Sequence, residues 1–293
     1  MNKGYPAAFS AYTFWGLSPI FWKFLSAIPA FEILIHRIIW SLPFLLLIIF
    51  YRNGLAGITN LFKNIINKKL YFLSAFLLAV NWLIFIWSVN NGYVVEASLG
   101  YFINPLVNVV LGVLLLKEGM RRLQWVAIFL ALTGVLYLTF NYGNFPWIAL
   151  SLAGTFAFYG YIRKIASLGS IDGLAFEMLV IYLPGLIVLG YFQNTHQLVF
   201  LDVPFSTRIL LIGTGLITTL PLLLFAFAAR KIPYSTLGFI QYIAPSFQFL
   251  LGVFLYHENF STERFIGFTF IWLALIIYSM ENISHFRRKK LLV

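Results

Sequence analysis

Three ionisable side chains lie close together near the start of the chain: Glu32, His36 and Arg37. Residues four positions apart face each other on a helix, so Glu32 and His36 share a face and Arg37 lies one position round. Such a group could exchange protons near neutral pH or bind the carboxylate of a substrate. The alternative is an interfacial salt-bridge cluster that pins a helix end, with Lys23 at the same level. We treat all four residues as candidates for ion coupling or gating.

A second group consists of amides inside apolar segments. Asn104 and Asn108 are four residues apart, and Gln241 and Gln248 are seven apart, so each pair shares a helical face. Asn81 lies midway along another apolar segment. In hydrocarbon an unpaired amide costs several kcal/mol, so these groups must face protein or a water-filled cavity.

We expect these amides and nearby aromatic residues to line a neutral polar cavity, with Trp22 and Trp40 adding to its walls. The alternative is that the amides join helices to one another, a role for which Asn and Gln are well suited. The candidate cavity residues are Trp15, Asn81, Trp82, Tyr101, Asn104, Asn108, Tyr159, Gln241, Tyr242 and Gln248.

Several chemistries find no support in the sequence. It contains no nucleotide-binding loop, no nucleophile motif and no cluster of His, Asp or Glu at metal-ligand spacing, and it has 0 cysteines. We therefore expect neither an enzyme nor a bound metal or cofactor. The net charge of +11 does not indicate a nucleic-acid partner, because the basic residues are spread over short connections between apolar runs.

The composition predicts an all-α integral membrane protein. Of the 293 residues 61% are hydrophobic and only 10% are charged, whereas soluble domains average roughly 25% charged residues. A membrane-spanning helix needs about 20 mostly apolar residues. Ten segments meet this condition, at 5–25, 31–51, 70–90, 96–116, 122–140, 146–164, 174–192, 208–229, 235–256 and 264–282.

The positions of the basic residues predict the orientation of these ten helices. If the N-terminus is cytoplasmic, only four of the 20 Lys and Arg residues lie on the outer side, namely Lys23, Arg37, Arg208 and Arg264. Positive charge collects in cytoplasmic loops, so both termini are predicted to be cytoplasmic. The tail Arg287–Lys290 would then anchor on anionic lipid. The inner connection 53–69 is either a short amphipathic helix on the membrane surface or an ordered loop, with Leu55, Ile58, Leu61, Phe62, Ile65 and Ile66 at helical spacing.

The chain also contains an internal repeat. Pro105, Gly112, Val113 and Glu118 recur as Pro245, Gly252, Val253 and Glu258, each shifted by 140 residues. Glu177 is the counterpart of Glu32 and a fifth candidate for ion coupling or gating, with the same structural alternative. Five helices is an odd number, so the two copies run in opposite directions through the membrane. We predict two inverted five-helix repeats, at 1–142 and 143–293, an arrangement typical of transporters. The alternative is chance similarity between apolar helices, and Glu118 and Glu258 are expected to be helix caps or loop charges.

Specific strings resemble one known family. They are Trp15-Gly16-Leu17-Ser18-Pro19 with Trp22-Lys23, Glu32 with His36-Arg37-Ile38-Ile39-Trp40-Ser41, Asn81-Trp82, Ile86-Trp87-Ser88-Val89-Asn90, Glu96 to Pro105, and Gln241-Tyr242-Ile243-Ala244-Pro245. Together they resemble the RarD group of the EamA branch of the drug/metabolite transporter superfamily, with Ser88 standing where alanine is expected. The resemblance implies ten helices, inverted halves, a bacterial inner-membrane location and secondary transport, most often export.

We therefore predict a secondary transporter that exports small amphipathic metabolites or drugs by alternating access. Its cavity would lie between the first, third, fourth, sixth, eighth and ninth helices, with Pro19, Pro105, Pro221 and Pro245 as helix breaks and pivots. Its partners would be a small-molecule substrate, membrane lipids and, as a further hypothesis, protons. The competing classes are a channel and a non-transporting membrane scaffold.

Overall fold

The computed structural model describes residues 2–63, 68–195, 198–257 and 262–291. Within these ranges the chain is helical and contains no strand. The helices are α1 (Gly4–Lys23), α2 (Ala30–Lys63), α3 (Lys68–Asn90), α4 (Val94–Leu114), α5 (Arg122–Tyr142), α6 (Trp147–Ile165), α7 (Ser170–Asn194), α8 (Phe205–Lys231), α9 (Tyr234–Gln241), α10 (Ile243–Leu250), the π-helix η1 (Leu251–Leu255) and α11 (Thr262–Leu291).

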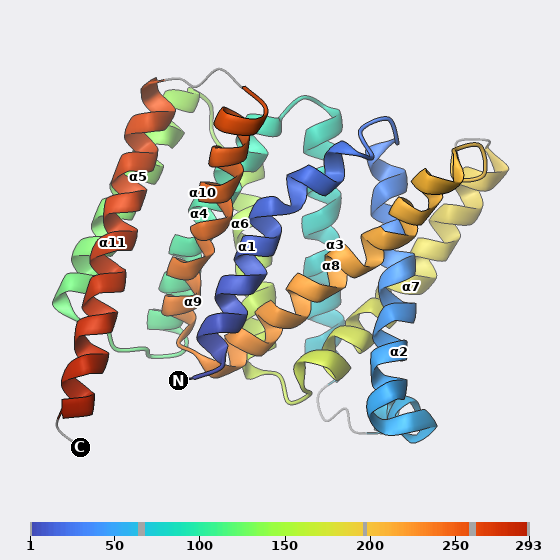
Figure 1. Ribbon diagram of the computed structural model, residues 1–293, viewed down its shortest axis with the longest axis horizontal. Coiled ribbons are helices and arrows are strands. Elements are labelled where there is room, and N and C mark those ends of the chain that lie inside the picture. The colour runs from blue at the N-terminus through green and yellow to red at the C-terminus, as the bar shows by residue number, and fades with distance from the viewer. Residues whose placement is uncertain (1, 64–67, 196–197, 258–261, 292–293) are drawn as a thin grey trace.

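The helices form one bundle, and α1 begins at the same end of it as α11 finishes (Figure 1). We call this the termini end and the opposite one the far end. The helices α5 and α11 pack together along one edge of the bundle, while α1, α4 and α6 lie nearer its middle. Because α9, α10 and η1 follow one another along one course, the described part of the chain makes ten helical passages.

Eight of these passages are long and apolar enough to span a membrane, with α9 to η1 counting as one. The prediction of a multi-pass helical membrane protein is thereby confirmed. The two remaining helices, α1 and α6, lie inside the bundle, where α1 packs on α8, α9 and α10 and α6 packs on α3, α4 and α8. Helices that face protein more than lipid can carry more polar residues, which explains their weaker apolar signal.

The four prolines that were expected to break helices do not all do so in the structure. The helices α1, α4 and α8 run on through Pro19, Pro105 and Pro221, so the breaks predicted at these three residues are not seen. Neighbouring helices can satisfy the carbonyl that a proline leaves free, and this permits a continuous helix. The ninth passage is interrupted: α9 ends at Gln241 and α10 starts at Ile243, just before Pro245.

The connection predicted to lie on the membrane surface is partly described. The chain turns sharply at Gly54, where φ is +63°, and continues as a helix to Lys63. In this piece Leu61 is buried and Ile58 is half-buried, whereas Leu55, predicted to share their face, is exposed. The side chains of Phe62, Ile65 and Ile66 lie outside the described set, as do Glu258 and the side chains of the basic tail Arg287–Lys290.

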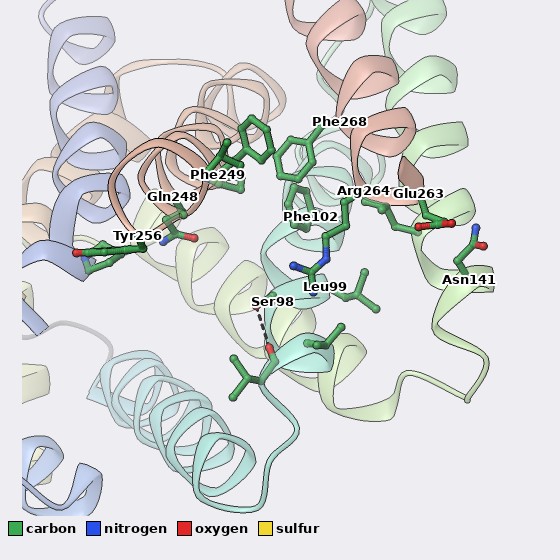
Figure 2. Close-up of a pocket in the computed structure, with 17 residues that line it drawn as sticks. Ser98, Leu99, Phe102, Asn141, Gln248, Phe249, Tyr256, Glu263, Arg264 and Phe268 are labelled. Carbon is green, nitrogen blue, oxygen red and sulfur yellow. Dashed lines mark hydrogen bonds between the residues drawn. The ribbon is translucent and has the colours of Figure 1, made fainter. Parts of the chain in front are cut away.

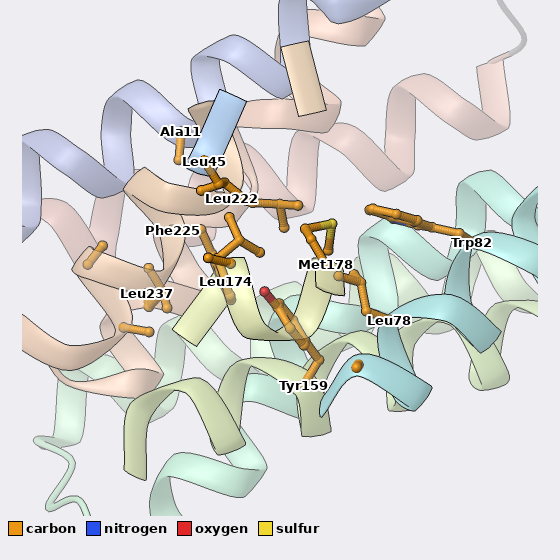
Figure 3. Close-up of a cluster of buried hydrophobic side chains, with 14 of the residues drawn as sticks. Ala11, Leu45, Leu78, Trp82, Tyr159, Leu174, Met178, Leu222, Phe225 and Leu237 are labelled. Carbon is orange, nitrogen blue, oxygen red and sulfur yellow. The ribbon is translucent and has the colours of Figure 1, made fainter. Parts of the chain in front are cut away.

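The largest apolar core joins helices from both halves of the sequence (Figure 3). It contains Leu78 of α3, Leu174 and Met178 of α7, and Leu222 and Phe225 of α8, all buried. The burial of these large side chains between helices from the two halves of the chain holds the halves together. Close backbone contact adds to this packing where Gly238 of α9 meets α4.

Candidate functional site

A cavity of about 960 Å³ lies at the far end of the bundle, between α4, α5, α10, η1 and α11 (Figure 2). Phe102, Phe249 and Phe268 form an apolar side of its wall, Ser98, Asn141 and Gln248 supply polar groups, and Glu263 and Arg264 supply charged ones. Of the ten predicted cavity residues, only Gln248 lines it as the structure describes it. Local spacing does not predict this cavity, because the residues that form it come from separate helices that meet only in the folded bundle.

Three of the predicted amides meet where α4 crosses α9. Gln241 Nε2 donates to Asn104 Oδ1 over 2.5 Å, and Asn108 Nδ2 donates to Gln241 Oε1 over 2.8 Å. Asn104 Nδ2 in turn donates to the carbonyl of Ala153 on α6, at 2.6 Å. All three amide side chains are buried. Asn108 Oδ1 is buried without a hydrogen-bond partner among the described residues. The other contacts of the network link α4, α6 and α9, which is the second of the two roles expected for the amides, the joining of helices.

The other predicted cavity residues are distributed over several contacts. Asn81 Nδ2 donates to the Leu152 carbonyl and to Thr155 Oγ1, each over 2.9 Å, and so ties α3 to α6. The hydroxyl of Tyr242 is buried and donates to the carbonyl of Phe102. The indole of Trp15 packs against the rings of Tyr12, Phe156 and Phe225.

Arg37 occupies a different environment from the amides. Its Nε donates to Thr218 Oγ1 of α8 over 2.9 Å. The guanidinium carbon lies 5.3 Å from the ring of Trp22 and 4.7 Å from that of Trp82. Tyr101 is close enough to interact electrostatically with this charge, and its side chain is 41% exposed. The structure thus gathers one cation and three aromatic rings from α1, α2, α3 and α4.

Glu32 and His36 lie above Arg37, towards the far end. Glu32 Oε2 accepts a hydrogen bond from the backbone N–H of Val199, and His36 Nδ1 accepts one from Trp40 Nε1. Glu32 Oε1 and His36 Nε2 are 3.8 Å apart, and both are buried without a hydrogen-bond partner among the described residues. Lys23, the remaining candidate at this end, lies over the ring of Tyr256 at 3.9 Å.

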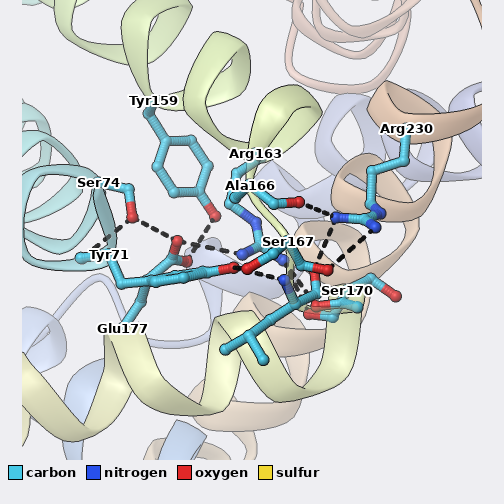
Figure 4. A network of polar contacts seen from close by, with 11 residues as sticks. Tyr71, Ser74, Tyr159, Arg163, Ala166, Ser167, Ser170, Glu177 and Arg230 are labelled. Atoms are coloured by element: carbon cyan, nitrogen blue, oxygen red, sulfur yellow. Dashed lines mark hydrogen bonds and ion pairs between the residues drawn. The ribbon is translucent and has the colours of Figure 1, made fainter. Parts of the chain in front are cut away.

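A buried ionic network closes the termini end (Figure 4). Glu177 of α7 pairs with Arg163 of α6, with 3.3 Å between Oε1 and Nη1, and both side chains are 0% exposed. Ser74 donates to Glu177 Oε1 over 2.5 Å, and Tyr159 donates to Oε2 over 3.3 Å. Glu177 therefore belongs to a cluster at the opposite end from Glu32, and α3, α6 and α7 are fastened together there.

Two further basic residues tighten the same end. Arg230 of α8 donates to the carbonyls of Ala166 and Leu168, after the end of α6. Lys164 donates to the carbonyls of Ala229 and Ile232 and lies 3.8 Å from Glu118. The site residues predicted from the sequence do not include Arg163, Lys164 and Arg230. Basic residues collect at the cytoplasmic ends of membrane helices in any case, so their position there does not by itself indicate a site. Glu177 was the indication of such a cation, because a carboxylate inside a membrane helix needs a positively charged partner nearby.

Comparison with known proteins gives one consistent result. Residues 2–140 match the EamA-like transporter family. The chain is 45% identical to Protein RarD of Streptomyces exfoliatus, over 96% of this chain and 90% of that protein. It is 42% identical to Protein RarD of Escherichia coli strain K12 (98% and 97% covered) and 40% identical to an uncharacterized transporter of Pseudomonas aeruginosa (98% and 97% covered). A solved structure described as "Crystal structure of protein" has the same fold, with a TM-score of 0.72 at 15% identity over 94% of this chain and 96% of that one.

Proposed function

Because this chain belongs to the RarD group of the EamA-like transporter family, we propose that it carries a small organic solute across the bacterial inner membrane by alternating access. The observation that carries this proposal is the difference between the two ends of the bundle. The far end holds a cavity of about 960 Å³, whereas the termini end holds a smaller one of about 410 Å³ beside Ser170 and Arg230, and Arg163 and Glu177 are fully buried there as an ion pair. A carrier in one of its two end states has one open side and one sealed side.

The packing of the helices supports the proposed inverted repeat, with halves at 1–142 and 143–293. In this repeat α1 corresponds to α6, α2 to α7, α3 to α8, α4 to α9 and α10, and α5 to α11. When each helix is exchanged for its counterpart, the main helix contacts of the bundle correspond in pairs. The contact of α3 with α6 corresponds to that of α8 with α1. The contact of α4 with α6 corresponds to that of α9 and α10 with α1, and the contact of α2 with α8 corresponds to that of α7 with α3. Two equivalent packings of this kind give the bundle two related states, which alternating access requires.

The direction and the driving force belong to the same proposal. With the termini in the cytoplasm, as the basic residues predict, the far-end cavity would open to the outside, where an exporter releases its cargo. Proton coupling would use Glu32 and His36, whose Oε1 and Nε2 atoms lie 3.8 Å apart and have no hydrogen-bond partner among the described residues. On this hypothesis Glu32→Gln retains substrate binding and loses gradient-driven transport. Unchanged driven transport in the variant would reject it and leave Glu32 as the acceptor for Val199.

Flux measurements in proteoliposomes test the proposal against the two competing classes. A panel of amino acids and small amphiphiles is assayed with and without an imposed pH gradient, and counterflow is measured for each. A carrier gives saturable flux and counterflow. A channel gives flux that does not saturate at modest concentrations, and a scaffold gives no flux for any solute; either result contradicts the proposal.

Alternating access itself is tested with single cysteines, since the natural chain has none. Ser98→Cys places a thiol in the far-end cavity, and Ala166→Cys places one at the sealed termini end, where Ala166 is 3% exposed. We expect a membrane-impermeant thiol reagent to label the first and spare the second, and a transported solute to shift the two rates in opposite directions. The control is Asn91→Cys, an exposed position outside the cavity, whose rate should not change. Labelling rates that rise or fall together at positions 98 and 166 would contradict alternating access.

A further inference from the structure

Arg37 is a cation held inside the bundle, and no carboxylate of the described residues pairs with it. It lies seven residues into α2, so about 10 Å along the helix axis from the far end. Among the described residues no Asp or Glu lies within ion-pair distance of it, and its one hydrogen bond runs from Nε to Thr218. A charge at membrane depth is costly and is usually retained for function.

Other arginines of the same chain show what a structural role looks like here. Arg163 is fully buried against Glu177, and its Nη2 donates to two backbone carbonyls. Arg121 is held by Glu281 in a two-pronged contact. Both have a carboxylate partner. Arg230 has none among the described residues, but its Nη groups donate to backbone carbonyls. The two Nη groups of Arg37 donate to no acceptor in the described part of the chain. Four N–H donors of Arg37 are therefore free for a bound molecule.

The rings around Arg37 form a matching apolar wall. Trp82 lies eight residues before the end of α3, and Tyr101 lies seven residues after the start of α4, which places both at about the depth of Arg37. Trp22 and Trp82 contact the guanidinium, and Tyr101 packs edge-on against Phe85 while 41% of its side chain stays exposed. A guanidinium that is held by ring faces keeps its edge available for hydrogen bonding.

We propose that Arg37 binds the carboxylate of the transported solute, and that the cargo is a small amphipathic organic anion whose apolar part lies against Trp82, Trp22 and Tyr101. The inference rests on the proposed transport function and adds its substrate class. The two Nη groups can hold a carboxylate in a bidentate, charge-assisted contact, which is stronger and more directional than a contact from lysine. Thr218 fixes the guanidinium from the Nε side and so leaves the Nη edge facing the solute.

Binding is tested with two probes of equal size, 3-phenylpropionate and its neutral amide 3-phenylpropanamide, by titration calorimetry on the full chain in detergent. We expect the wild type to bind the carboxylate about tenfold or more tightly than the amide, because only the anion gains the charge-assisted pair. Arg37→Gln should weaken carboxylate binding by about tenfold or more, to the level of the amide, and leave amide binding unchanged. Arg37→Lys keeps the charge but not the planar fork, so its affinity for the carboxylate should lie between those of the wild type and Arg37→Gln.

The matched control is Arg122→Gln, the same change at an exposed arginine at the start of α5. It should bind both probes as the wild type does, and melting temperatures of all variants show that each is folded. A wild type that does not prefer the carboxylate, including one that binds neither probe, overturns the inference. So does equal carboxylate binding in wild type and Arg37→Gln. Failure of the transport proposal is seen separately, as the lack of saturable flux for any solute in proteoliposomes.

Discussion

Arg163 of α6 and Glu177 of α7 form an ion pair in which both side chains are fully buried, with 3.3 Å between Nη1 and Oε1. Ser74 and Tyr159 complete the hydrogen bonding of the carboxylate. Breaking a buried pair is costly because the remaining charge stays buried without compensation. The pair therefore couples the stability of the chain to the closure of its termini end.

Removal of one partner should be much more damaging than removal of both. Glu177→Ala leaves Arg163 uncompensated, and we expect it to cost about 3–5 kcal/mol of stability. The double variant Arg163→Met with Glu177→Leu should recover most of this loss, since no buried charge remains. Thermal unfolding in detergent provides the measurement.

A second ion pair serves as the control for this prediction. Arg121 and Glu281 pair near the surface, where the arginine side chain is 37% exposed. Glu281→Gln should cost at most about 1 kcal/mol, because water screens an exposed pair. If both single variants melt alike, the Arg163–Glu177 pair is not the closing contact we describe.

The amide network gives a prediction that separates the joining of helices from the binding of cargo. Gln241→Leu removes the donor to Asn104 and the acceptor for Asn108, and should cost about 1–3 kcal/mol of stability. If the network only joins α4 to α9, the KM of a transported solute should stay unchanged. Gln248→Leu, at the wall of the far-end cavity, should show the reverse: little loss of stability and a raised KM. A raised KM in Gln241→Leu with an unchanged melting temperature would return the amides to the substrate cavity.

Two glycines test how closely the two halves approach. A Cβ added at Gly238 of α9 would lie 2.7 Å from the Pro105 carbonyl oxygen and 2.9 Å from the Asn108 Cβ, so α4 and α9 would have to move apart. We expect Gly238→Ala to cost about 1–3 kcal/mol and to lower the melting temperature. Gly154→Ala on α6 meets nothing within 4 Å, and should stabilise the helix by about 0.5–1 kcal/mol. Equal effects of the two substitutions would argue against tight packing at this crossing.

The sequence analysis was strongest for features set by local spacing. Helix positions follow from apolar runs, and the four-residue spacing of Asn104 and Asn108 puts both on one face of α4, where Asn108 Nδ2 donates to Asn104 Oδ1. Pairing of the amides with one another, and not with a cavity, depends on which helices cross, and no local spacing contains that information. The same holds for Arg37, whose aromatic neighbours come from α1 and α3 and whose hydrogen-bond partner comes from α8.

Basic residues show most clearly what cannot be predicted from the sequence alone. Arg163 and Lys164 are adjacent in the sequence, and the orientation predicted from the basic residues puts both on the cytoplasmic side. In the structure Arg163 is fully buried, while Lys164 retains some exposure beside Glu118. Since α6 rotates by about 100° per residue, neighbours along the chain face different surroundings, and only the packed bundle decides which of them is buried.

Glu118 gives the last prediction, because its carboxylate joins the end of α4 to the start of α9. It accepts hydrogen bonds from the backbone N–H groups of Tyr234 and Ser235, at 2.6 and 2.8 Å, and from Ser235 Oγ at 2.7 Å. A negative charge at a helix N-terminus satisfies free N–H groups and interacts favourably with the helix dipole. Glu118→Ala should therefore cost about 1–2 kcal/mol, measured by thermal unfolding.

Glu118→Gln retains one acceptor oxygen but turns an NH₂ group towards N–H donors, so it should recover only part of this loss. The control is Asp172→Asn, which removes a carboxylate in the first turn of α7 and should change stability by less than about 0.5 kcal/mol. Because Glu118 reaches from the first half of the chain to the second, its loss should also loosen the sealed termini end and raise thiol labelling at position 166. A destabilised Glu118→Ala with unchanged labelling would show that the cap supports α9 without contributing to closure.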